Sequence, residues 1–480
     1  MTKQDLEHIF NPQSVAIVGA STKGIGLQQA SATVFLQSLL SCGFKGKIYP
    51  VNPKRGQISG LEIYASVKDI PEPVDYAICG ISALQVPQLI RDCVAKGAKA
   101  IHVITSGFSE SGTEEGKQLE QEISSLARHN GIRVIGPNCM GVYCPKVGLS
   151  FSPDFFTMES GPVAFISQSG GNSFYIVREG FRRGIRFSKV ISYGNACDVN
   201  ESDLLEYLAS DSDTEIITAY IEGAKDGKRF HRVLKEAAKA KPVIMLKGGA
   251  GEAGARAVAS HTGVLAGSEK VWDALLRQIG VVRVNSLEEL VDTAVTFTRL
   301  PLPPGKMLGL LGISGGATVL ATDDCTSAGL LIPRLPTEIQ DKLRAYLNKG
   351  GIGVSLNNPV DLSDQGWDAS YDCAKTMLDY EGIDLLIFQL PLGIFPHFSP
   401  EICSAAISTI EDVIKAHKES NKPMAIVIHS LVSGETYQLA LDCEQRCCEA
   451  GLPVYHSLTN ASKAIARFLD YHEHKAKGTR

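Results

Sequence analysis

Residues 14–26 read Ser-Val-Ala-Ile-Val-Gly-Ala-Ser-Thr-Lys-Gly-Ile-Gly. The apolar run Ser14–Val18 predicts a buried strand, and the glycines that follow it predict a tight turn into a helix. Glycines at such a turn let backbone N–H groups approach an anionic group, and the dipole of the following helix favours negative charge there. The stretch therefore indicates an α/β domain with a phosphate-rich ligand at the end of its first strand.

The spacing of these glycines does not match the G-x-G-x-x-G fingerprint of dinucleotide-binding domains. The next strand ends in Asn52-Pro53-Lys54 instead of an acidic residue, and a lysine suits a phosphate better than a ribose diol. A Tyr-x3-Lys match at Tyr64 and Lys68 lies too close to the N-terminus to indicate a short-chain dehydrogenase. We therefore favour a ligand such as CoA over a nicotinamide dinucleotide, and a glycine turn without any ligand stays as an alternative.

Short apolar runs alternate with helical stretches through the first 145 residues. The strand candidates are 14–18, 47–51, 76–79, 100–104 and 133–135, and amphipathic stretches lie at 86–95 and 115–128. This alternation predicts right-handed βαβ crossovers and a parallel sheet. We predict a Rossmann-like domain over residues 1–145.

The alternation of predicted strands and helices begins again twice later in the chain. Strand candidates at 163–166, 190–192, 216–220 and 243–246 predict a second domain over residues 161–298, after a linker at 146–160. A proline-rich segment at 300–305 precedes a third predicted domain over residues 306–470, with strand candidates at 307–313, 385–389 and 424–429. The runs 163–171 and 308–316 both place Ser-Gly-Gly after an apolar strand, so we predict one flavodoxin-like, parallel-sheet architecture for both domains.

Composition excludes several classes of protein. The chain has 480 residues, a net charge of -5 and no strongly basic character, so no nucleic-acid partner is expected. The N-terminal residues do not resemble a secretory signal, and no apolar run reaches the roughly 18–20 residues of a membrane-spanning helix, so we predict a cytoplasmic protein without membrane contact. The 12 cysteines lack the paired spacing of metal ligands, and we expect free thiols and no metal site.

Two later loops resemble the glycine-rich turn that follows the first predicted strand. Their residues are Ser167, Ser169, Gly170 and Gly171 in the second domain and Gly315 and Gly316 in the third. Each loop follows a predicted strand and opens a helix, so its N–H groups can bind a phosphate. Two such loops in related positions suggest one phosphate held between two helix ends.

His261 lies in a stretch of small residues, 254–267, that is bounded by glycines. A neutral imidazole is a competent nucleophile toward a phosphoryl group, and small residues permit a loop that packs closely or swings. Glu222 ends another predicted strand, and a carboxylate orients an imidazole by accepting its N–H. A single histidine is more often a structural or surface residue, so the spacing alone leaves that alternative open.

Seven segments together resemble a known family. They are 11–21 (Asn-Pro-Gln-Ser-Val-Ala-Ile-Val-Gly-Ala-Ser), 48–54 (Ile-Tyr-Pro-Val-Asn-Pro-Lys), 136–139 (Gly-Pro-Asn-Cys), 167–170 (Ser-Gln-Ser-Gly), 220–223 (Tyr-Ile-Glu-Gly), 260–263 (Ser-His-Thr-Gly) and 358–362 (Asn-Pro-Val-Asp-Leu). The set is similar to the α subunit of ADP-forming (NDP-forming) acetyl-CoA synthetase and, more distantly, to that of succinyl-CoA synthetase. The resemblance covers nearly the whole chain.

The resemblance implies roles for individual residues. His261 matches the histidine that is phosphorylated in this family, and Glu222 matches the carboxylate that supports it. Ser169 and Gly170, with Gly315 and Gly316, match the helix ends that face the transferred phosphate. CoA is expected at Gly19, Ala20, Ser21, Lys23, Gly24, Ile25, Gly26, Asn52, Lys54, Thr105, Ser106, Gly107, Phe108 and Asn138.

The implied reaction is acyl-CoA + ADP + phosphate ⇌ carboxylic acid + CoA + ATP, through an acyl phosphate and a phosphohistidine. In this family the nucleotide binds to an ATP-grasp module, which we do not find in this chain, and no Walker loop is present either. The resemblance therefore implies a separate ATP-grasp β subunit that holds ATP or ADP with Mg²⁺, in an assembly that is usually α2β2.

This chain departs from the family pattern at three places: Gly171-Asn172-Ser173, Tyr193 and Ile313-Ser314. If these residues line the acyl pocket, the acid differs from acetate. Two other functions stay open at this point, a different CoA-dependent acyl or CoA transferase and a CoA-sensing protein without catalysis. Neither of these would need a phosphorylated His261.

Overall fold

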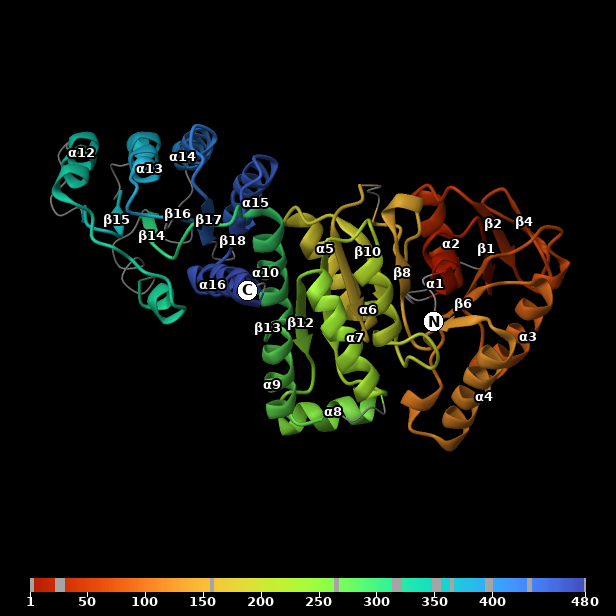
Figure 1. Cartoon of the computed structure of the whole chain (residues 1–480). Coiled ribbons are helices and arrows are strands. Elements are labelled where there is room, and N and C mark those ends of the chain that lie inside the picture. The colour runs from red at the N-terminus through yellow and green to blue at the C-terminus, as the bar shows by residue number, and fades with distance from the viewer. Residues whose placement is uncertain are drawn as a thin grey trace. The chain divides into compact units, whose positions relative to one another are not determined.

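The computed structural model describes residues 4–21, 31–155, 159–262, 267–312, 322–347, 355–362, 367–392, 400–429 and 434–478. They form three main sheets of mostly parallel strands with helices on their faces (Figure 1). The first and second sheets lie in one compact unit, residues 1–179 and 186–290, and the third lies in another, residues 180–185 and 291–480. The predicted fold class, an α/β chain of parallel-sheet domains, is confirmed.

The first sheet has the parallel strand order β2-β1-β5-β6-β7. Its strands are β1 (Ser14–Val18), β2 (Lys47–Val51), β5 (Tyr76–Cys79), β6 (Ala100–Val103) and β7 (Arg133–Ile135), and a separate hairpin joins β3 (Gly56–Ile58) to β4 (Leu61–Ile63). The helices of this region are α1 (Gln4–Phe10), α2 (Ala32–Ser41), α3 (Val86–Lys96) and α4 (Glu114–Asn130), with short 3-10 turns η1 (Val67–Asp69), η2 (Ala83–Gln85), η3 (Ser109–Ser111) and η4 (Pro145–Val147). Counted from β1, the order is 2-1-3-4-5, which places a crevice at the carboxyl ends of the strands.

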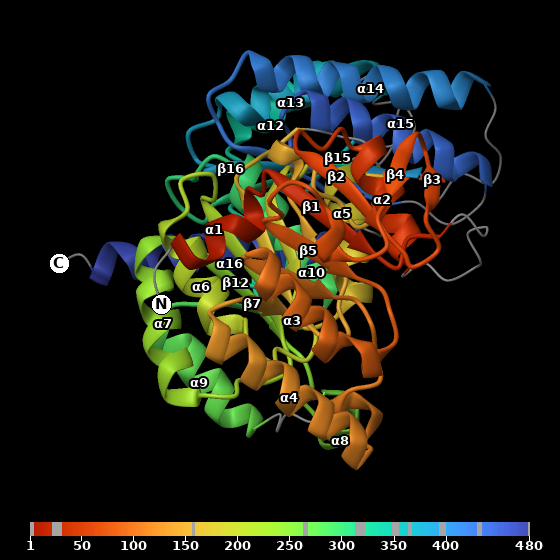
Figure 2. The ribbon, with the colours of Figure 1, turned by 90° about the vertical axis from the view of Figure 1, so that its right-hand side faces the viewer.

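The strand β1 is buried along its whole length, as expected for a strand with helices on both faces of its sheet. Its alternate residues Ala16 and Val18 join an apolar cluster that includes Ile90 of α3 and Ile123 of α4. Figure 2 shows α3 and α4 side by side. The helix α4 begins where the Thr113 side chain accepts a hydrogen bond from a backbone N–H, which is an N-cap.

The second sheet has the order β13-β12-β11-β9-β10-β8. Its strands are β8 (Gly141–Tyr143), β9 (Val163–Ser167), β10 (Phe187–Ser192), β11 (Ile216–Ile221), β12 (Val243–Lys247) and β13 (Val282–Val284), and its helices are α5 (Gly170–Arg182), α6 (Glu201–Ser210), α7 (Gly227–Ala240), α8 (Glu252–Thr262), α9 (Glu269–Ile279) and α10 (Leu287–Arg299). Counted from β9, the five parallel strands again have the order 2-1-3-4-5. The strand β8 falls within the predicted first domain, 1–145, but pairs antiparallel with β10 and covers the edge of the second sheet.

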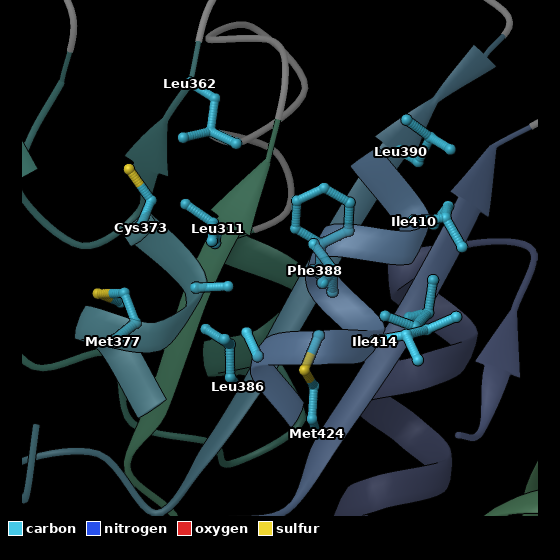
Figure 3. Packing of buried hydrophobic residues seen from close by; sticks show 14 of the residues in the cluster. Leu311, Leu362, Cys373, Met377, Leu386, Phe388, Leu390, Ile410, Ile414 and Met424 are labelled. Atoms are coloured by element: carbon cyan, nitrogen blue, oxygen red, sulfur yellow. The ribbon is translucent and has the colours of Figure 1, made fainter. Parts of the chain in front are cut away.

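The third sheet repeats this order as β15-β14-β16-β17-β18. Its strands are β14 (Leu308–Gly312), β15 (Val360–Asp361), β16 (Leu385–Pro391), β17 (Met424–His429) and β18 (Val454–Tyr455), and its helices include α12 (Thr337–Leu347), α13 (Ser370–Asp379), α14 (Pro400–Lys418), α15 (Gly434–Glu449) and α16 (Leu458–Gly478), with the 3-10 turn η5 (Trp367–Ala369). Figure 3 shows Leu386 and Phe388 of β16 packed near Met377 of α13 and Ile410 of α14. The neighbouring residue Ile387 belongs to a second cluster with α16, so this sheet is also covered on both faces.

The predicted strands lie close to the observed ones. The ranges 14–18, 47–51, 76–79, 133–135 and 424–429 agree at both ends, and most of the others differ by one or two residues. The strand predicted at 190–192 begins three residues earlier, at Phe187. Within the described part of the chain, no helix is both long enough and apolar enough to span a bilayer.

Candidate active site and family

The first candidate site lies at the carboxyl edge of the first sheet, directly after β1. Gly19 has a φ of +99°, and a Cβ at this position would lie 2.8 Å from the carbonyl oxygen of Gly80. A residue without a side chain lets the ends of β1 and β5 approach this closely. The carbonyl of buried Ala20 accepts a hydrogen bond of 2.8 Å from Nδ2 of Asn52, so the end of β2 holds the turn in place.

Ser21 and Lys54 flank this turn. The backbone N–H of Ser21 donates to Oγ1 of Thr33 at 3.0 Å, and that hydroxyl donates back to the carbonyl of Ser21 at 3.2 Å. The backbone N–H of Lys54 donates to Oδ1 of Asn52 at 2.9 Å, while Lys54 itself is exposed. The polar side chain of Asn52 thus ties the turn after β1 to the lysine that was predicted to meet a phosphate.

The segment Thr105–Phe108 follows β6 at the same edge. Oγ1 of Thr105 donates to the carbonyl of Ile81 at 2.6 Å, and the carbonyl of Thr105 accepts the N–H of Asn138 at 3.0 Å. Ser106 and Gly107 are exposed, whereas Phe108 is fully buried. The structure therefore brings the turn at 19–21, the segment 105–108 and Asn138 to one edge of one sheet.

Six predicted site residues fall outside the described residues. They are Lys23, Gly24, Ile25 and Gly26 in the first turn, and Gly315 and Gly316 after β14.

The second candidate site lies at the carboxyl edge of the second sheet. Oγ of Ser167 donates to the carbonyl of Ser169 at 2.8 Å and accepts the backbone N–H of Ser169 at 3.0 Å. Oγ of Ser169 accepts the backbone N–H of Asn172 at 3.3 Å and so caps α5, which begins at Gly170. A Cβ on Gly170 would lie 2.7 Å from Cγ of Met140, whereas a Cβ on Gly171 would meet only Oγ of Ser169, at 4.0 Å. The end of α5 that carries a partial positive charge therefore opens next to two glycines.

Glu222 follows β11, on the strand next to β9. It is 5% exposed, and its Oε1 accepts a hydrogen bond of 3.1 Å from the hydroxyl of Tyr220. Its backbone N–H donates to the side-chain oxygen of Gln168, so it is fixed to the loop that precedes α5. Its Oε2 is buried and has no hydrogen-bond partner among the described residues. A buried carboxylate oxygen without a partner is costly, and it is suited to accept a hydrogen bond from a group that is brought to it.

His261 lies in the last turn of α8, and its side chain is outside what the structure describes. The expectation of a loop over 254–267 is wrong as far as Thr262, because the alanine-rich stretch continues the helix. The helix α8 contacts η3, which follows the predicted CoA segment 105–108. The helix that carries His261 therefore contacts the 3-10 turn directly after the segment 105–108.

Lys247 was not among the predicted site residues, but it lies at the same edge of the second sheet. It ends β12, the strand next to β11, and only 4% of it is exposed. Its ammonium donates to the carbonyl of Gly248 and lies 5.1 Å from the ring centre of Trp272. Burial lowers the pKa of Lys247 to about 8, although the charge of Glu222 raises it and that of Arg283 lowers it further. A charged residue at the end of an apolar strand, the signal that drew attention to Glu222, also points to Lys247.

Asn195 was also missed, and it joins the two candidate sites. Its Nδ2 lies 2.5 Å from Oε2 of Glu110, 2.8 Å from Oε2 of Glu120 and 3.4 Å from Oγ of Ser109. Oε1 of Glu110 in turn accepts the N–H of Gly107 at 2.6 Å. The loop after β10 thus fixes the segment 105–108 through one amide group, and no pattern local to either segment predicts this contact.

Tyr193, one of the departures from the family pattern, follows β10 at the same edge. It is fully buried, and its hydroxyl has no hydrogen-bond partner among the described residues. Burial raises the pKa of Tyr193, and nearby negative charges, among them Glu201 and Glu222, raise it further.

A metal site is not found in the described residues, because no group of three or more His, Cys, Asp or Glu side chains there could hold an ion. The cysteines are unpaired, and most of them are buried.

Two protein families match separate parts of the chain. The CoA binding domain family matches residues 13–145, and the succinyl-CoA ligase-like flavodoxin domain family matches residues 160–297. The two matches fall on the first and second sheets, which carry the two candidate sites.

Whole proteins are similar to this chain over nearly its full length. Acetate–CoA ligase [ADP-forming] I subunit alpha of Pyrococcus furiosus is 37% identical over 98% of this chain and 99% of its own. Acetate–CoA ligase [ADP-forming] of Methanocaldococcus jannaschii is 36% identical over 98% of this chain, which spans 64% of that protein. Among solved structures, the dinucleotide-forming acetyl-coenzyme A synthetase 1 of Ca. Korarchaeum cryptofilum, in complex with phosphate and ADP, has a TM-score of 0.81 at 30% identity and covers 98% of this chain and 97% of its own. The chain therefore belongs to the family of ADP-forming acetate–CoA ligases, which are acid–thiol ligases.

Proposed function

We propose that this chain is the α subunit of an ADP-forming acyl-CoA ligase and that His261 carries the phosphoryl group during turnover. The observation that supports this role best is the buried Oε2 of Glu222, which has no partner among the described residues and lies one strand away from the N-terminus of α5. An imidazole N–H donated to that oxygen leaves the other ring nitrogen unprotonated and able to attack phosphorus.

The reaction has three transfers. First, an oxygen of phosphate attacks the thioester carbonyl of acyl-CoA, the C–S bond breaks, and CoA leaves as a thiol after it takes up a proton. Second, the imidazole of His261 forms an N–P bond while the P–O bond of the acyl phosphate breaks, and the carboxylate leaves. Third, the phosphoryl group passes from the ring to ADP and gives ATP.

The residues of this chain supply positioning and charge for these transfers. The N-terminus of α5, with Ser169, Gly170 and Gly171, offers N–H groups and a helix dipole to the transferred phosphoryl group. The turn at 19–21 with Asn52, Lys54 and the segment 105–108 is proposed to bind CoA. Phosphoryl transfer depends on positioning and charge stabilisation more than on covalent help, so this inventory is sufficient for the α subunit.

The nucleotide and Mg²⁺ are proposed to bind to a separate ATP-grasp β subunit, in an α2β2 assembly. The relatives named as alpha subunits support a partner subunit of this kind. The acid is left open because Tyr193 and Asn172 differ from the family pattern, and a panel of carboxylic acids scored for CoA-thioester formation would identify it.

The test is to incubate the assembled complex with ATP labelled in its γ-phosphate and to look for acid-labile label on the protein. We expect the label on His261, and we expect His261→Ala to abolish both label and turnover while CoA binding is kept. Glu222→Gln should slow labelling by about 10²–10⁴-fold, because it removes the charge that supports the ring. The matched control is His231→Ala, at an exposed histidine of α7, which should behave like the wild type.

An active complex that never acquires label on His261 would refute the proposal. Turnover without label would favour a CoA transferase, and CoA binding without turnover by any acid would favour a sensing protein.

A further inference from the structure

The two carboxylate oxygens of Glu222 have different surroundings. Oε1 accepts the Tyr220 hydroxyl at 3.1 Å, whereas Oε2 is buried without a hydrogen-bond partner among the described residues. The carboxylate is therefore anchored through one oxygen, and the other is left for a donor that comes from elsewhere.

The anchor itself is fixed by the backbone. Tyr220 lies near the end of β11, and Gly248 follows β12 on the neighbouring strand. A Cβ on Gly248 would lie 2.6 Å from the Tyr220 hydroxyl, so the glycine makes room for the phenol beside Glu222. The N–H of Gly248 donates to the carbonyl of Ile221 at 2.9 Å, which holds the two strand ends together.

Lys247 provides a positive charge beside this anchor. It pairs in register with Ile221, the residue before Glu222, so the two residues belong to neighbouring strand ends, and the charge of Glu222 acts on the ammonium. Both residues are about 95% buried, and no ion pair within 4 Å joins them in the described part of the chain. In surroundings that exclude water, charges interact over longer distances than in solution, so the ammonium of Lys247 and the carboxylate of Glu222 attract each other without touching.

We propose that Tyr220 and Lys247 are positioning residues for Glu222. The phenol fixes Oε1, the ammonium attracts the carboxylate from the neighbouring strand end, and Oε2 stays open to accept the N–H of the His261 ring while the other ring nitrogen forms its bond to phosphorus. This inference rests on the function proposed above, because it requires a phosphoryl group on His261.

The test uses the assembled complex and measures the initial rate of labelling of His261 from labelled ATP. We expect Tyr220→Phe and Lys247→Met each to lower this rate by about 10–100-fold. Losses of this size are typical when a group that orients a functional side chain, here Glu222, is removed. The KM for ATP and the Kd for CoA should stay unchanged, because neither side chain is proposed to touch these ligands. Lys247→Arg should restore part of the rate, because it keeps the charge.

The matched control is Tyr207→Phe. The hydroxyl of Tyr207 donates to Oε2 of Glu7 at 3.0 Å, so this variant removes the same kind of bond from the same unit but away from the strand ends at Glu222. It should label His261 at the wild-type rate. A general structural effect would instead lower the thermal midpoint and the labelling rate of the control and the test variant together.

The outcomes separate the two proposals. If wild-type enzyme labels His261 and both Tyr220→Phe and Lys247→Met label it equally fast, the positioning role is wrong and the proposed function stands. If active wild-type enzyme acquires no label, the proposed function fails and the positioning role fails with it. If one variant does not fold, the rate measured with the other decides.

Discussion

Replacing Gly19 with alanine tests whether the turn after β1 holds CoA. Two features of this position resist a side chain. Its φ of +99° lies in the region that L-residues rarely adopt, and the new Cβ would lie 2.8 Å from the backbone carbonyl oxygen of Gly80. That is about 0.6 Å short of the 3.4 Å at which ordinary contact begins. Because the obstacle is backbone, the ends of β1 and β5 must move apart.

The two features can be separated with a matched control. Gly97, at the end of α3, has a φ of +83° and no atom within 4 Å of an added Cβ. Gly97→Ala should therefore show the backbone cost alone, about 1–2 kcal/mol. Gly19→Ala should show that cost plus overpacking of about 1–3 kcal/mol. If this overpacking destabilises the CoA-bound protein by about 1.4 kcal/mol more than the free protein, the Kd for CoA rises tenfold.

The assay is calorimetric titration of CoA into wild type, Gly19→Ala and Gly97→Ala, with the urea midpoint measured for each. We expect at least about tenfold weaker CoA binding for Gly19→Ala and wild-type binding for Gly97→Ala. A folded Gly19→Ala protein that binds CoA as tightly as the wild type would show that this turn is not part of the CoA site.

Three other predictions follow from buried polar groups. Asn195→Ala should lower the free energy of unfolding by about 1–3 kcal/mol and weaken CoA binding, because the carboxylates of Glu110 and Glu120 lose the amide donor. Urea unfolding and titration with CoA would measure the two effects, and unchanged CoA binding would contradict the link between the two sheet edges. Arg183→Met should lower the free energy of unfolding by about 3–5 kcal/mol, because the buried carboxylates of Asp292 (2.7 Å from Nη2) and Glu444 (3.5 Å from Nε) lose this cation. An unchanged urea midpoint would contradict this prediction. Burial lowers the pKa of Lys247 from 10.5 to about 8, so between these pH values the unfolded chain binds a proton that the folded chain has released, and the contribution of Lys247 to the free energy of unfolding rises with pH. From pH 8 to pH 10, the free energy of unfolding of the wild type should therefore rise relative to that of Lys247→Met. A difference between the two proteins that stays constant over this range would refute the lowered pKa of Lys247.

The sequence by itself determined most strands of the three sheets and much of the candidate chemistry. Strands such as Ser14–Val18 and Tyr76–Cys79 are found at the predicted residues because a parallel strand covered on both faces must be a short apolar run between turn residues. Glycine turns at strand ends and the acidic residue Glu222 were visible for the same reason, since each interrupts an apolar pattern. The roles of His261 and Glu222 came from the family resemblance, and they stay predictions until the labelling experiment is done.

Tertiary structure alone decided which of these groups meet. Glu222 and Lys247 are 25 positions apart in the chain, and they become neighbours because the strand order places β11 beside β12. The contact of Asn195 with Glu110 and the recruitment of β8 to the second sheet depend in the same way on pairing between distant segments. A local pattern records only whether a residue is buried and in which element it lies, whereas the partner of a buried polar group is set by the order in which strands assemble.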